Sequence, residues 1–384
     1  MHSTVEPAQP HAPRVTRRRA LRSVGRITLG AMVAPCVSPW LAACTSRSGQ
    51  RGAAARVTAY VSADDALARE VLAACTRATG IEVDAAFDTE ANKTVGLERR
   101  LIAERDRPRA DLFWSSEGFA PLRLAKAGVL RPLPDALVDS WPAPHRDPSG
   151  RWIGFAARAR VIVSRAGSGA PAPIASWADL ATPNLARGSV ASIAIADPRF
   201  GTTNGHISAL ASAWNAARAR GVDAPELDAW LDAMRANGVR VLMGGNAATV
   251  EAVATGECAY GLTDTDDALA AIDRGLPIAM SLPRSLPAGN AGGGTMLVPN
   301  TVCAIAGGPA GPALADPVVA FLISPECEDI IARSPSRNLP LGPKATARVP
   351  FAERDPLGFD LAEAADRSAE RATAAKARLE GVSQ

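Results

Sequence analysis

The sequence has few of the residues on which many enzymes depend. Aromatic residues make up 4% of the 384 residues, and Tyr60 and Tyr260 are the only tyrosines. After the first 43 residues only His145 and His206 remain of the histidines, and neither lies in a Gly-x-Ser-x-Gly nucleophile motif. A serine triad needs a base and an acid around its nucleophile, and none can be assembled here. We therefore expect neither an enzyme nor a catalytic cofactor, and an extracellular hydrolase is the distant alternative.

The cysteines lack the close paired spacing, such as Cys-x-x-Cys, that is typical of zinc and redox motifs. Cys36 and Cys44 lie near the N-terminus, and the other four lie in apolar settings, where buried cysteine is common. An oxidising compartment permits a disulfide, and Cys303 with Cys327 is the pair that we expect. The two cysteines left over are Cys75 and Cys258.

No basic patch with interleaved aromatic residues is present, so we do not expect nucleic-acid binding. The formal charge of +3 is misleading, because residues 1–43 hold six Arg and one Glu, and without their +5 the charge is −2. The 384-residue chain less these 43 residues is 341 residues long, which suits two domains of ordinary size.

The sequence also lacks a long uncharged apolar run, apart from residues 27–43. This stretch is shorter than the ~20 residues that a transmembrane helix needs, and Pro35 and Pro39 interrupt it. It follows Arg17-Arg18-Arg19 and ends in Leu41-Ala42-Ala43-Cys44. A basic head, an apolar middle and small residues before the cut predict a signal peptide over residues 1–43. A retained membrane anchor is the alternative.

The run that ends in Cys44 resembles a bacterial lipobox, in which the cysteine is acylated after cleavage. The arginine run resembles a twin-arginine export signal, with Ala20 where Phe is usual. These resemblances imply a periplasmic or otherwise extracytoplasmic protein that is held to the membrane by lipid on Cys44 alone. Residues 44–55 are small and polar and suit a flexible tether.

From residue 56 onward, strand-like and helix-like segments alternate. Residues 57–61 are typical of a strand, and Asp64 or Asp65 can cap a helix that ends at Gly80. Residues 81–87 alternate as a strand. Further alternating helices and strands are expected over residues 95–128 and 193–263. Val161–Val163 is expected to be a strand, and residues 361–379 are typical of a surface helix. Alternating units of this kind predict an α/β fold with a parallel sheet covered by helices on both faces.

Several motifs then occur in an order that resembles a known family. They are Thr76-Arg77-Ala78-Thr79-Gly80-Ile81-Glu82-Val83, Ala110-Asp111-Leu112-Phe113-Trp114-Ser115-Ser116-Glu117, Pro299-Asn300-Thr301, Ser324-Pro325-Glu326 and Pro335-Ser336-Arg337-Asn338-Leu339-Pro340-Leu341. Over residues 56–345 the chain resembles the ferric-iron-type solute-binding proteins of ABC importers. Each motif alone is weak, and their shared order makes the set specific.

The resemblance implies an α/β, two-lobe, type II periplasmic-binding-protein fold, with two mixed sheets flanked by helices and joined by hinge strands. We expect one lobe from residues 56–157 and 278–336, and the other from 158–277 and 337–384. Cargo would bind in the cleft between the lobes. The partner would be an ABC transporter permease, and a monomer is usual in the family.

The resemblance also implies a metal site. Asp64 stands where the relatives often have a metal-binding His, and Glu117 is the nearest match to a carboxylate ligand, with one residue inserted. Asp266 and Asp267 replace an adjacent pair of tyrosines, which is the main departure from the family. Carboxylate-rich sites suit Mg²⁺, Ca²⁺ or Mn²⁺. Each of these residues can instead serve a helix N-terminus, as a cap or through the helix dipole.

An anion site is implied beside the metal site. The family binds a synergistic anion at the positions of Thr202 and Thr203 and contacts it near Asn246, although capping explains the same residues. We assign Asp264 to the substrate as well. Arg158 could grip an anion in bidentate fashion, and a structural ion pair, for it and for Arg160, is the alternative.

The cleft rim is expected to include Asp88 and Glu90, although helix capping by Asp88 or Thr89 explains this polar run equally well. The expected cargo is ferric iron, or another hard cation, with an oxyanion. A small organic anion, such as a phosphonate or a phosphorylated metabolite, is the alternative, because Asp266 and Asp267 could receive an ammonium group.

Overall fold

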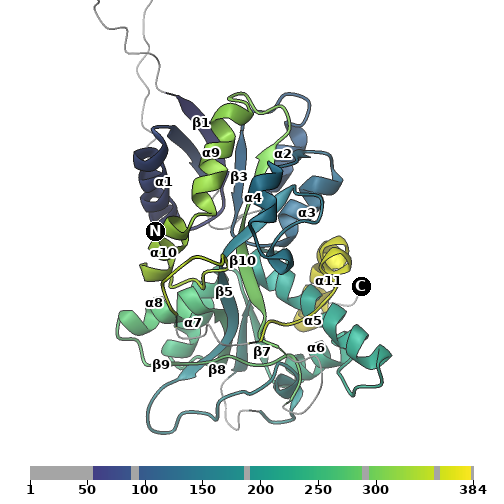
Figure 1. Cartoon of the computed structure of the whole chain (residues 1–384). Coiled ribbons are helices and arrows are strands. Elements are labelled where there is room, and N and C mark those ends of the chain that lie inside the picture. The colour runs from purple at the N-terminus through teal and green to yellow at the C-terminus, as the bar shows by residue number, and fades with distance from the viewer. Residues whose placement is uncertain (1–54, 88–94, 186–190, 288–293, 350–354, 382–384) are drawn as a thin grey trace, which may run out of the picture. The chain divides into compact units, whose positions relative to one another are not determined.

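The computed structural model describes residues 55–87, 95–185, 191–287, 294–349 and 355–381 (Figure 1). The expected signal peptide, Cys44, Asp88 and Glu90 lie outside these residues. Within the described ranges, no helix combines the length and the apolar character that crossing a membrane requires.

The first group of strands follows the predicted pattern. β1 (Arg56–Val61) pairs in parallel with β2 (Glu82–Phe87) on one side and with β3 (Leu112–Ser115) on the other. β10 (Leu297–Ile305) runs antiparallel to β3 and to the short β4 (Leu130–Arg131). The parallel pairing is confirmed for β1–β3, and β10 makes the sheet mixed.

The second group is also mixed. β6 (Ala191–Ala196) pairs in parallel with β7 (Val239–Leu242) and β8 (Cys258–Asp264). β8 runs antiparallel to β5 (Trp152–Arg165), which also pairs with β9 (Ile278–Ser281). The order across both groups is β2-β1-β3-β10-β5-β8-β6-β7.

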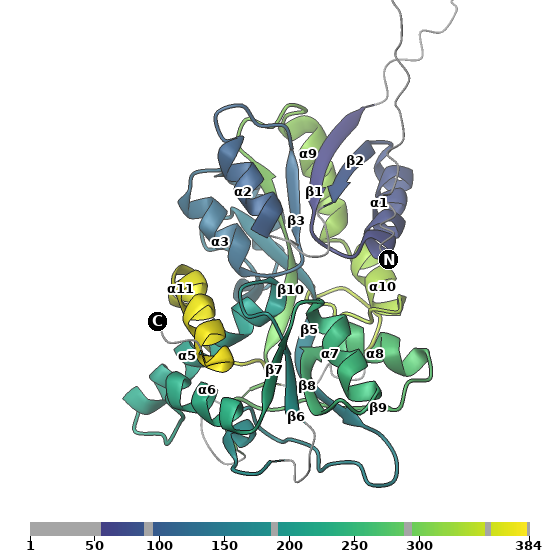
Figure 2. The ribbon, with the colours of Figure 1, turned by 180° about the vertical axis from the view of Figure 1, so that it is seen from behind.

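β5 joins the two groups because it is 14 residues long and changes partners along its length. Its first part, Trp152 to Ala159, pairs with β10, and its second part, from Arg160, pairs with β8 and β9. Figure 2 shows β5 and β10 running between the half with β1–β3 and the half with β6–β8. The sequence predicted only Val161–Val163 as a strand, because Arg158, Arg160 and a glycine interrupt the apolar pattern before it.

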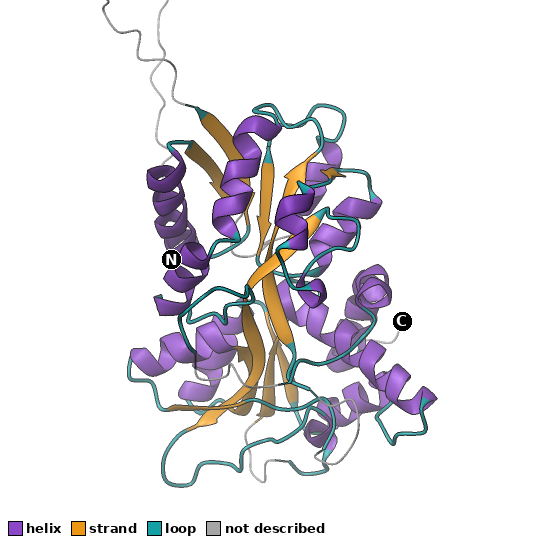
Figure 3. Cartoon of the chain, in the orientation of Figure 1, coloured by secondary structure: helices purple, strands orange, loops and turns teal. Residues whose placement is uncertain are grey.

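Helices cover both strand groups, as Figure 3 shows by colour. Those around the first group are α1 (Asp65–Thr79), α2 (Val95–Ala103), α3 (Phe119–Lys126), α4 (Asp135–Asp139), α9 (Pro312–Leu322) and α10 (Pro325–Arg333). Those around the second are α5 (Gly201–Ala219), α6 (Leu227–Ala236), α7 (Gly245–Ala254) and α8 (Thr265–Asp273). Short 3₁₀ turns occur at Ala143–His145 and Ala178–Ala181.

The C-terminal helix α11 (Leu361–Glu380) packs on α5 and α6 and also contacts α3. The Ser208 hydroxyl of α5 donates to the Ala364 carbonyl at 2.6 Å. α11 therefore covers the second strand group and contacts a helix of the first. The expected lobe boundaries stay a prediction, and β9, which falls in the range expected for the first lobe, pairs with the part of β5 that β8 also contacts.

The expected disulfide between Cys303 and Cys327 is wrong. Both thiols are free and buried, as are those of Cys75 and Cys258. Cys303 lies on β10 in one apolar cluster, where its thiol contacts the Phe113 carbonyl at 3.6 Å. Cys327 lies on α10 in a different apolar cluster. The fold places the two residues in separate parts of the core.

Close packing behind β8 generates a first prediction. A Cβ added at Gly261 would lie 2.9 Å from both Thr249 Cγ2 and Val253 Cγ2 and 3.1 Å from Val163 Cγ2. We expect Gly261→Ala to lower the free energy of unfolding by about 1–3 kcal/mol, as overpacking does, measured by urea denaturation. Gly358→Ala is the control, because its added Cβ would meet no atom within 4 Å. Equal stability of both variants would contradict the prediction.

Candidate functional site

A cavity of about 590 Å³ lies where loops that follow strands of both groups meet. The loops come after β1, β3, β6, β7 and β8, and β5 contributes one side chain. In open α/β sheets, ligands bind outside the carboxyl ends of strands in this way. The structure brings most of the predicted site residues to this cavity: Asp64, Arg158, Thr202, Thr203, Asn246, Asp264, Asp266 and Asp267.

Asp264 is the centre of a buried polar network. It is the last residue of β8 and is 1% exposed. Its Oδ1 accepts from Arg160 Nη1 at 2.8 Å, and its Oδ2 accepts from Arg158 Nε at 3.1 Å. The same Oδ2 accepts from the Thr202 hydroxyl at 2.7 Å and from Asn246 Nδ2 at 2.9 Å. One carboxylate therefore ties β8 to β5 and to the first turns of α5 and α7.

These contacts determine what Asp264 can do. Burial alone would raise the pKa of Asp264, but the guanidinium groups of Arg160 and Arg158 hold that pKa below its usual value. With four donors on two oxygens, the carboxylate has little capacity left for a ligand. Asp264 is therefore better suited to positioning the other groups than to binding cargo itself, and the predicted structural ion pair is present for both arginines.

Arg158 connects the two strand groups at the base of the cavity. Its Nη2 donates to the carbonyl of Ser116, in the loop after β3, at 2.7 Å. Its Nε contacts Asp264 and lies 3.8 Å from Asp266 Oδ2. The side chain is 10% exposed, so a small part of it remains available to the cavity. Sequence reasoning missed the Ser116 carbonyl, because a backbone acceptor leaves no trace in side-chain patterns.

Asp266 and Asp267 begin α8 and face the cavity beside Asp264. Ligand oxygens of all three carboxylates lie within 4.8 Å of one another. Burial raises the pKa of Asp266, and the nearby negative charge of Asp264 raises it further, although Arg158 acts in the opposite direction. The site thus holds more negative charge than its arginines neutralise, and a cation in the cavity would relieve the difference.

Asp64 lies at the cavity edge and also caps α1. Its Oδ1 accepts from the backbone N–H of Ala66 at 3.0 Å, which is the N-cap role that the sequence left open. The second carboxylate oxygen has no hydrogen bond among the described residues. The side chain is therefore capable of serving the helix and the cavity at once.

The part of the cavity wall next to Asp264 carries hydrogen-bond donors. Thr202 and Thr203 lie in the first turn of α5, and Asn246 lies in the first turn of α7. The free N–H groups of helix N-termini attract anions. The buried hydroxyl of Thr203 has no hydrogen-bond partner among the described residues. This wall is suited to an oxyanion, although Thr202 is already committed to Asp264.

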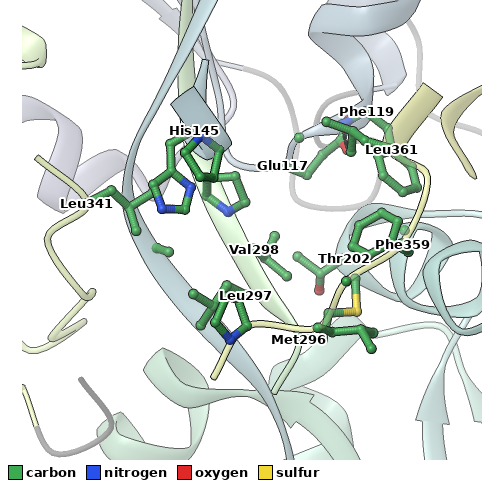
Figure 4. A pocket seen from close by; sticks show the side chains of 18 of the residues that line it. Glu117, Phe119, His145, Thr202, Met296, Leu297, Val298, Leu341, Phe359 and Leu361 are labelled. Carbon is green, nitrogen blue, oxygen red and sulfur yellow. Dashed lines mark hydrogen bonds between the residues drawn. The ribbon is translucent and has the colours of Figure 1, made fainter. Parts of the chain in front are cut away.

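Glu117 is the predicted metal ligand that the structure does not bring to this cavity. Its carboxylate accepts from the backbone N–H groups of Phe119 at 2.6 Å and Ala120 at 2.7 Å, so it caps α3. It lines a separate, mainly apolar cavity of about 300 Å³ beside His145 and Phe359 (Figure 4). Ser116, the residue before it, lines the first cavity.

His206 also lies away from the polar cavity. Its ring is fully buried against Trp177, with ring centroids 4.1 Å apart. Burial, together with the charge of Arg160, lowers the pKa of His206 well below its usual value. The neutral ring is part of the core of the second strand group.

Comparisons with known proteins agree with this architecture. A family model described as bacterial extracellular solute-binding protein matches residues 55–334. The iron-bound HitA of Pseudomonas aeruginosa has a similar structure, with a TM-score of 0.67 and 21% identity over 84% of this chain and 99% of that one. Trichodesmium FutA, in complex with iron and citrate, has a TM-score of 0.67 and 20% identity over 85% and 99%.

A third similar structure has a different ligand. The periplasmic binding protein AfuA of Actinobacillus pleuropneumoniae, with fructose-6-phosphate bound, has a TM-score of 0.65 and 15% identity over 84% of this chain and 96% of that one. At these identities the structures establish the shared fold, and the predicted two-lobe binding-protein fold is confirmed.

The buried network generates a second prediction. Asp264→Asn leaves two buried guanidinium groups without their shared carboxylate, and we expect it to lower the free energy of unfolding by about 3–5 kcal/mol. Chemical denaturation at pH 7 measures the loss. Because the folded-state pKa of Asp264 is depressed, its contribution is present above the unfolded pKa and is lost as the pH falls through the folded value.

The control for this prediction is Asp228→Asn, which breaks an exposed pair with Arg378. Exposed pairs contribute about 0–1 kcal/mol. A loss for Asp264→Asn no larger than that of the control would show that the network does not stabilise the fold.

Asp266 generates a third prediction, in which the substitution raises the stability of the protein instead of lowering it. Its folded-state pKa is raised, so the folded protein loses stability as the pH rises from the unfolded pKa to the folded pKa, and the loss is complete above the folded pKa. We therefore expect Asp266→Asn to raise the melting temperature of the cargo-free protein at pH 7. The difference should vanish at a pH below the unfolded pKa, where the carboxyl group is protonated in both states. A lower melting temperature of Asp266→Asn at pH 7 would contradict the inferred excess of negative charge around Asp266.

Proposed function

The chain belongs to the family of bacterial extracellular solute-binding proteins, and from this premise we propose that it delivers a hard cation, held with an oxyanion, to an ABC importer. The observation that carries the proposal is the excess of carboxylate at the polar cavity. Ligand oxygens of Asp264, Asp266 and Asp267 lie within 4.8 Å of one another, and Arg158 lines the cavity with them.

The cation ligands are assigned from the position of each carboxylate in the cavity and from the contacts of Asp264. Asp264 is occupied by four donors and holds the site in place. Asp266 and Asp267 are the principal ligands, and Asp64 supplies a further oxygen from the first strand group. Hard cations prefer such oxygen ligands. Ligands from both groups would let the cargo hold the two lobes together, as hinge closure of binding proteins requires.

The anion would complete the coordination from the wall formed by the first turns of α5 and α7. Thr203, the first turn of α5 and the first turn of α7 are directed at the same cavity as the carboxylates. An oxyanion bound there would face the cation and balance its charge. Ferric iron is the first cargo to test, since HitA and FutA bind iron on the same fold.

A second candidate cargo is a phosphorylated metabolite. AfuA binds fructose-6-phosphate on this fold, and the donors of α5 and α7 could hold a phosphate group in the present chain. Asp266 and Asp267 would then accept from sugar hydroxyls or an ammonium group. The two candidates use the same anion wall and differ in the role of the aspartates.

The family also suggests a location, a mode of membrane attachment and a protein partner. We propose a periplasmic or extracytoplasmic location, a lipid on Cys44 as the only membrane attachment, and a monomer that docks on an ABC permease. No catalytic role is proposed for any residue of the cavity.

A fourth prediction separates the two cargoes. Ferric citrate, ferric iron with phosphate, Ca²⁺, Mn²⁺, phosphate alone and fructose-6-phosphate are added to the purified protein in a thermal-shift titration. A ligand that binds only the folded state stabilises it by about 2.7 kcal/mol at a hundredfold excess over Kd. We expect a shift with a cation and anion together, and we expect the double variant Asp266→Asn, Asp267→Asn to lose it.

Asp135→Asn is the matched control, because Asp135 also begins a helix but is exposed and away from the cavity. A shift with fructose-6-phosphate and none with any cation would support the second candidate. If the double variant retained full affinity for the cation, the assignment of the ligands would be wrong.

A further inference from the structure

Two apolar side chains line the polar cavity beside its anion wall. Met243 is 69% exposed, whereas the other two large apolar side chains that are exposed in the described part of the chain, Ile102 and Ile272, are each 38% exposed. Met243 and the half-buried Phe200 both line the cavity. A single exposed apolar residue on a protein surface is ordinary, but Met243 belongs to the lining of the proposed cargo site.

Phe200 and Met243 hold equivalent places before two helices. β6 and β7 are neighbouring parallel strands, and Ala196 pairs with Leu242 at their ends. Phe200-Gly201-Thr202-Thr203 then leads into α5, and Met243-Gly244-Gly245-Asn246 leads into α7. In both segments an apolar residue comes first, glycine follows, and polar residues of the first helical turn come last. The two adjacent strands therefore deliver two similar segments to one end of the sheet.

The glycines let each segment turn from strand to helix. Gly201 has φ of +53° and Gly245 has φ of +72°, a left-handed conformation that glycine adopts without steric cost. The residue before each turn and the residues after it all line the same cavity. An apolar side chain and the N–H groups of a helix N-terminus are thus presented together, twice.

The polar end of an anionic ligand has a place beside these side chains. Helix N-termini attract anions, and the hydroxyl of Thr203 lines the cavity without a hydrogen-bond partner among the described residues. Thr203 is 1% exposed, and a buried polar group without a partner is costly. An oxyanion at the two first turns would satisfy this hydroxyl. A substituent on that oxyanion would face the part of the cavity that Phe200 and Met243 line.

The cavity is also larger than a cation and an inorganic oxyanion require. Its volume is about 590 Å³, whereas a water molecule takes up only ~30 Å³ of the liquid. Sites for organic ligands typically have volumes of ~300–1,000 Å³ and combine apolar side chains with a few well-placed polar groups. The cavity has room for an organic group beside the ions.

We propose that the oxyanion is an organic one that carries an apolar substituent, and that Met243 and Phe200 form the apolar subsite that selects it. The inference rests on the proposed function, because it places the oxyanion at the first turns of α5 and α7. The flexible, polarisable thioether of methionine packs well against aromatic and aliphatic groups. A sugar phosphate is disfavoured, since its hydroxyl groups would lose water against apolar side chains without gaining a partner.

The test compares two oxyanions with the same head group. Methylphosphonate and phenylphosphonate are titrated into the purified protein by calorimetry, each with and without Mn²⁺. The two ligands differ only in the size of the apolar substituent. We expect phenylphosphonate to bind about tenfold more tightly, at the lower end of what contacts in an apolar pocket provide, because the subsite is partly open.

Variants of the subsite separate its effect from that of the head group. Met243→Gln keeps the length of the side chain and removes its apolar character, and Phe200→Ala removes the ring. Each should reduce the preference for phenylphosphonate and leave the affinity for methylphosphonate unchanged. Ile272→Gln is the matched control, because Ile272 is an exposed apolar residue of α8 that lies outside the lining of the cavity. It should keep the full preference.

The outcomes distinguish this inference from the proposed function. If methylphosphonate binds and phenylphosphonate binds no more tightly, the subsite is wrong and the anion wall stands. A full preference in both Met243→Gln and Phe200→Ala would overturn the subsite as well, and so would an equal loss of preference in Ile272→Gln. If neither anion binds, with or without Mn²⁺, the proposed function fails together with the subsite.

Discussion

The structure depends on one buried carboxylate that holds two buried guanidinium groups. Removing Asp264, Arg158 and Arg160 from water is unfavourable unless their charges and hydrogen bonds are matched. The match is made between β8 and β5, with Thr202 and Asn246 as further donors. It fixes the first turns of α5 and α7 and the end of β8 relative to the linking strand, so the cavity wall is built before any cargo arrives.

The same network explains the division of roles among the aspartates. The two arginines neutralise Asp264. Asp266 and Asp267 add negative charge next to it, and among the described residues Asp266 has no comparable cationic partner. Under the proposed function, this arrangement would reduce the stability of the empty protein, and a cation in the cavity would offset it. Binding sites commonly accept this trade-off between stability and function. Arg158 also bonds to Ser116, so the network extends from the cargo cavity to the linking strand.

Local signals in the sequence predicted much of the fold. Asp64 and Gly80 mark the ends of α1 as expected, because capping depends on neighbours in sequence. The full length of β5 and the burial of Arg160 could not be predicted, since they depend on charge pairing with a residue about a hundred positions away. The role of Glu117 at the start of α3, where it accepts from the N–H groups of Phe119 and Ala120, could be named only as one of two alternatives, because a carboxylate before a helix suits both a cap and a ligand. The separation of Cys303 from Cys327 is set by packing in different clusters, which spacing does not encode.

The central claim is that Asp266 and Asp267 bind a cation while Asp264 stays with its arginines. Anomalous X-ray diffraction from crystals of the protein grown with ferric citrate tests it most directly. The account predicts a metal peak bonded to oxygens of Asp266 and Asp267, with an oxyanion on the first turns of α5 and α7 and the contacts of Asp264 unchanged. A peak at Asp264 with the arginines displaced, or no metal in the cavity at all, would contradict it.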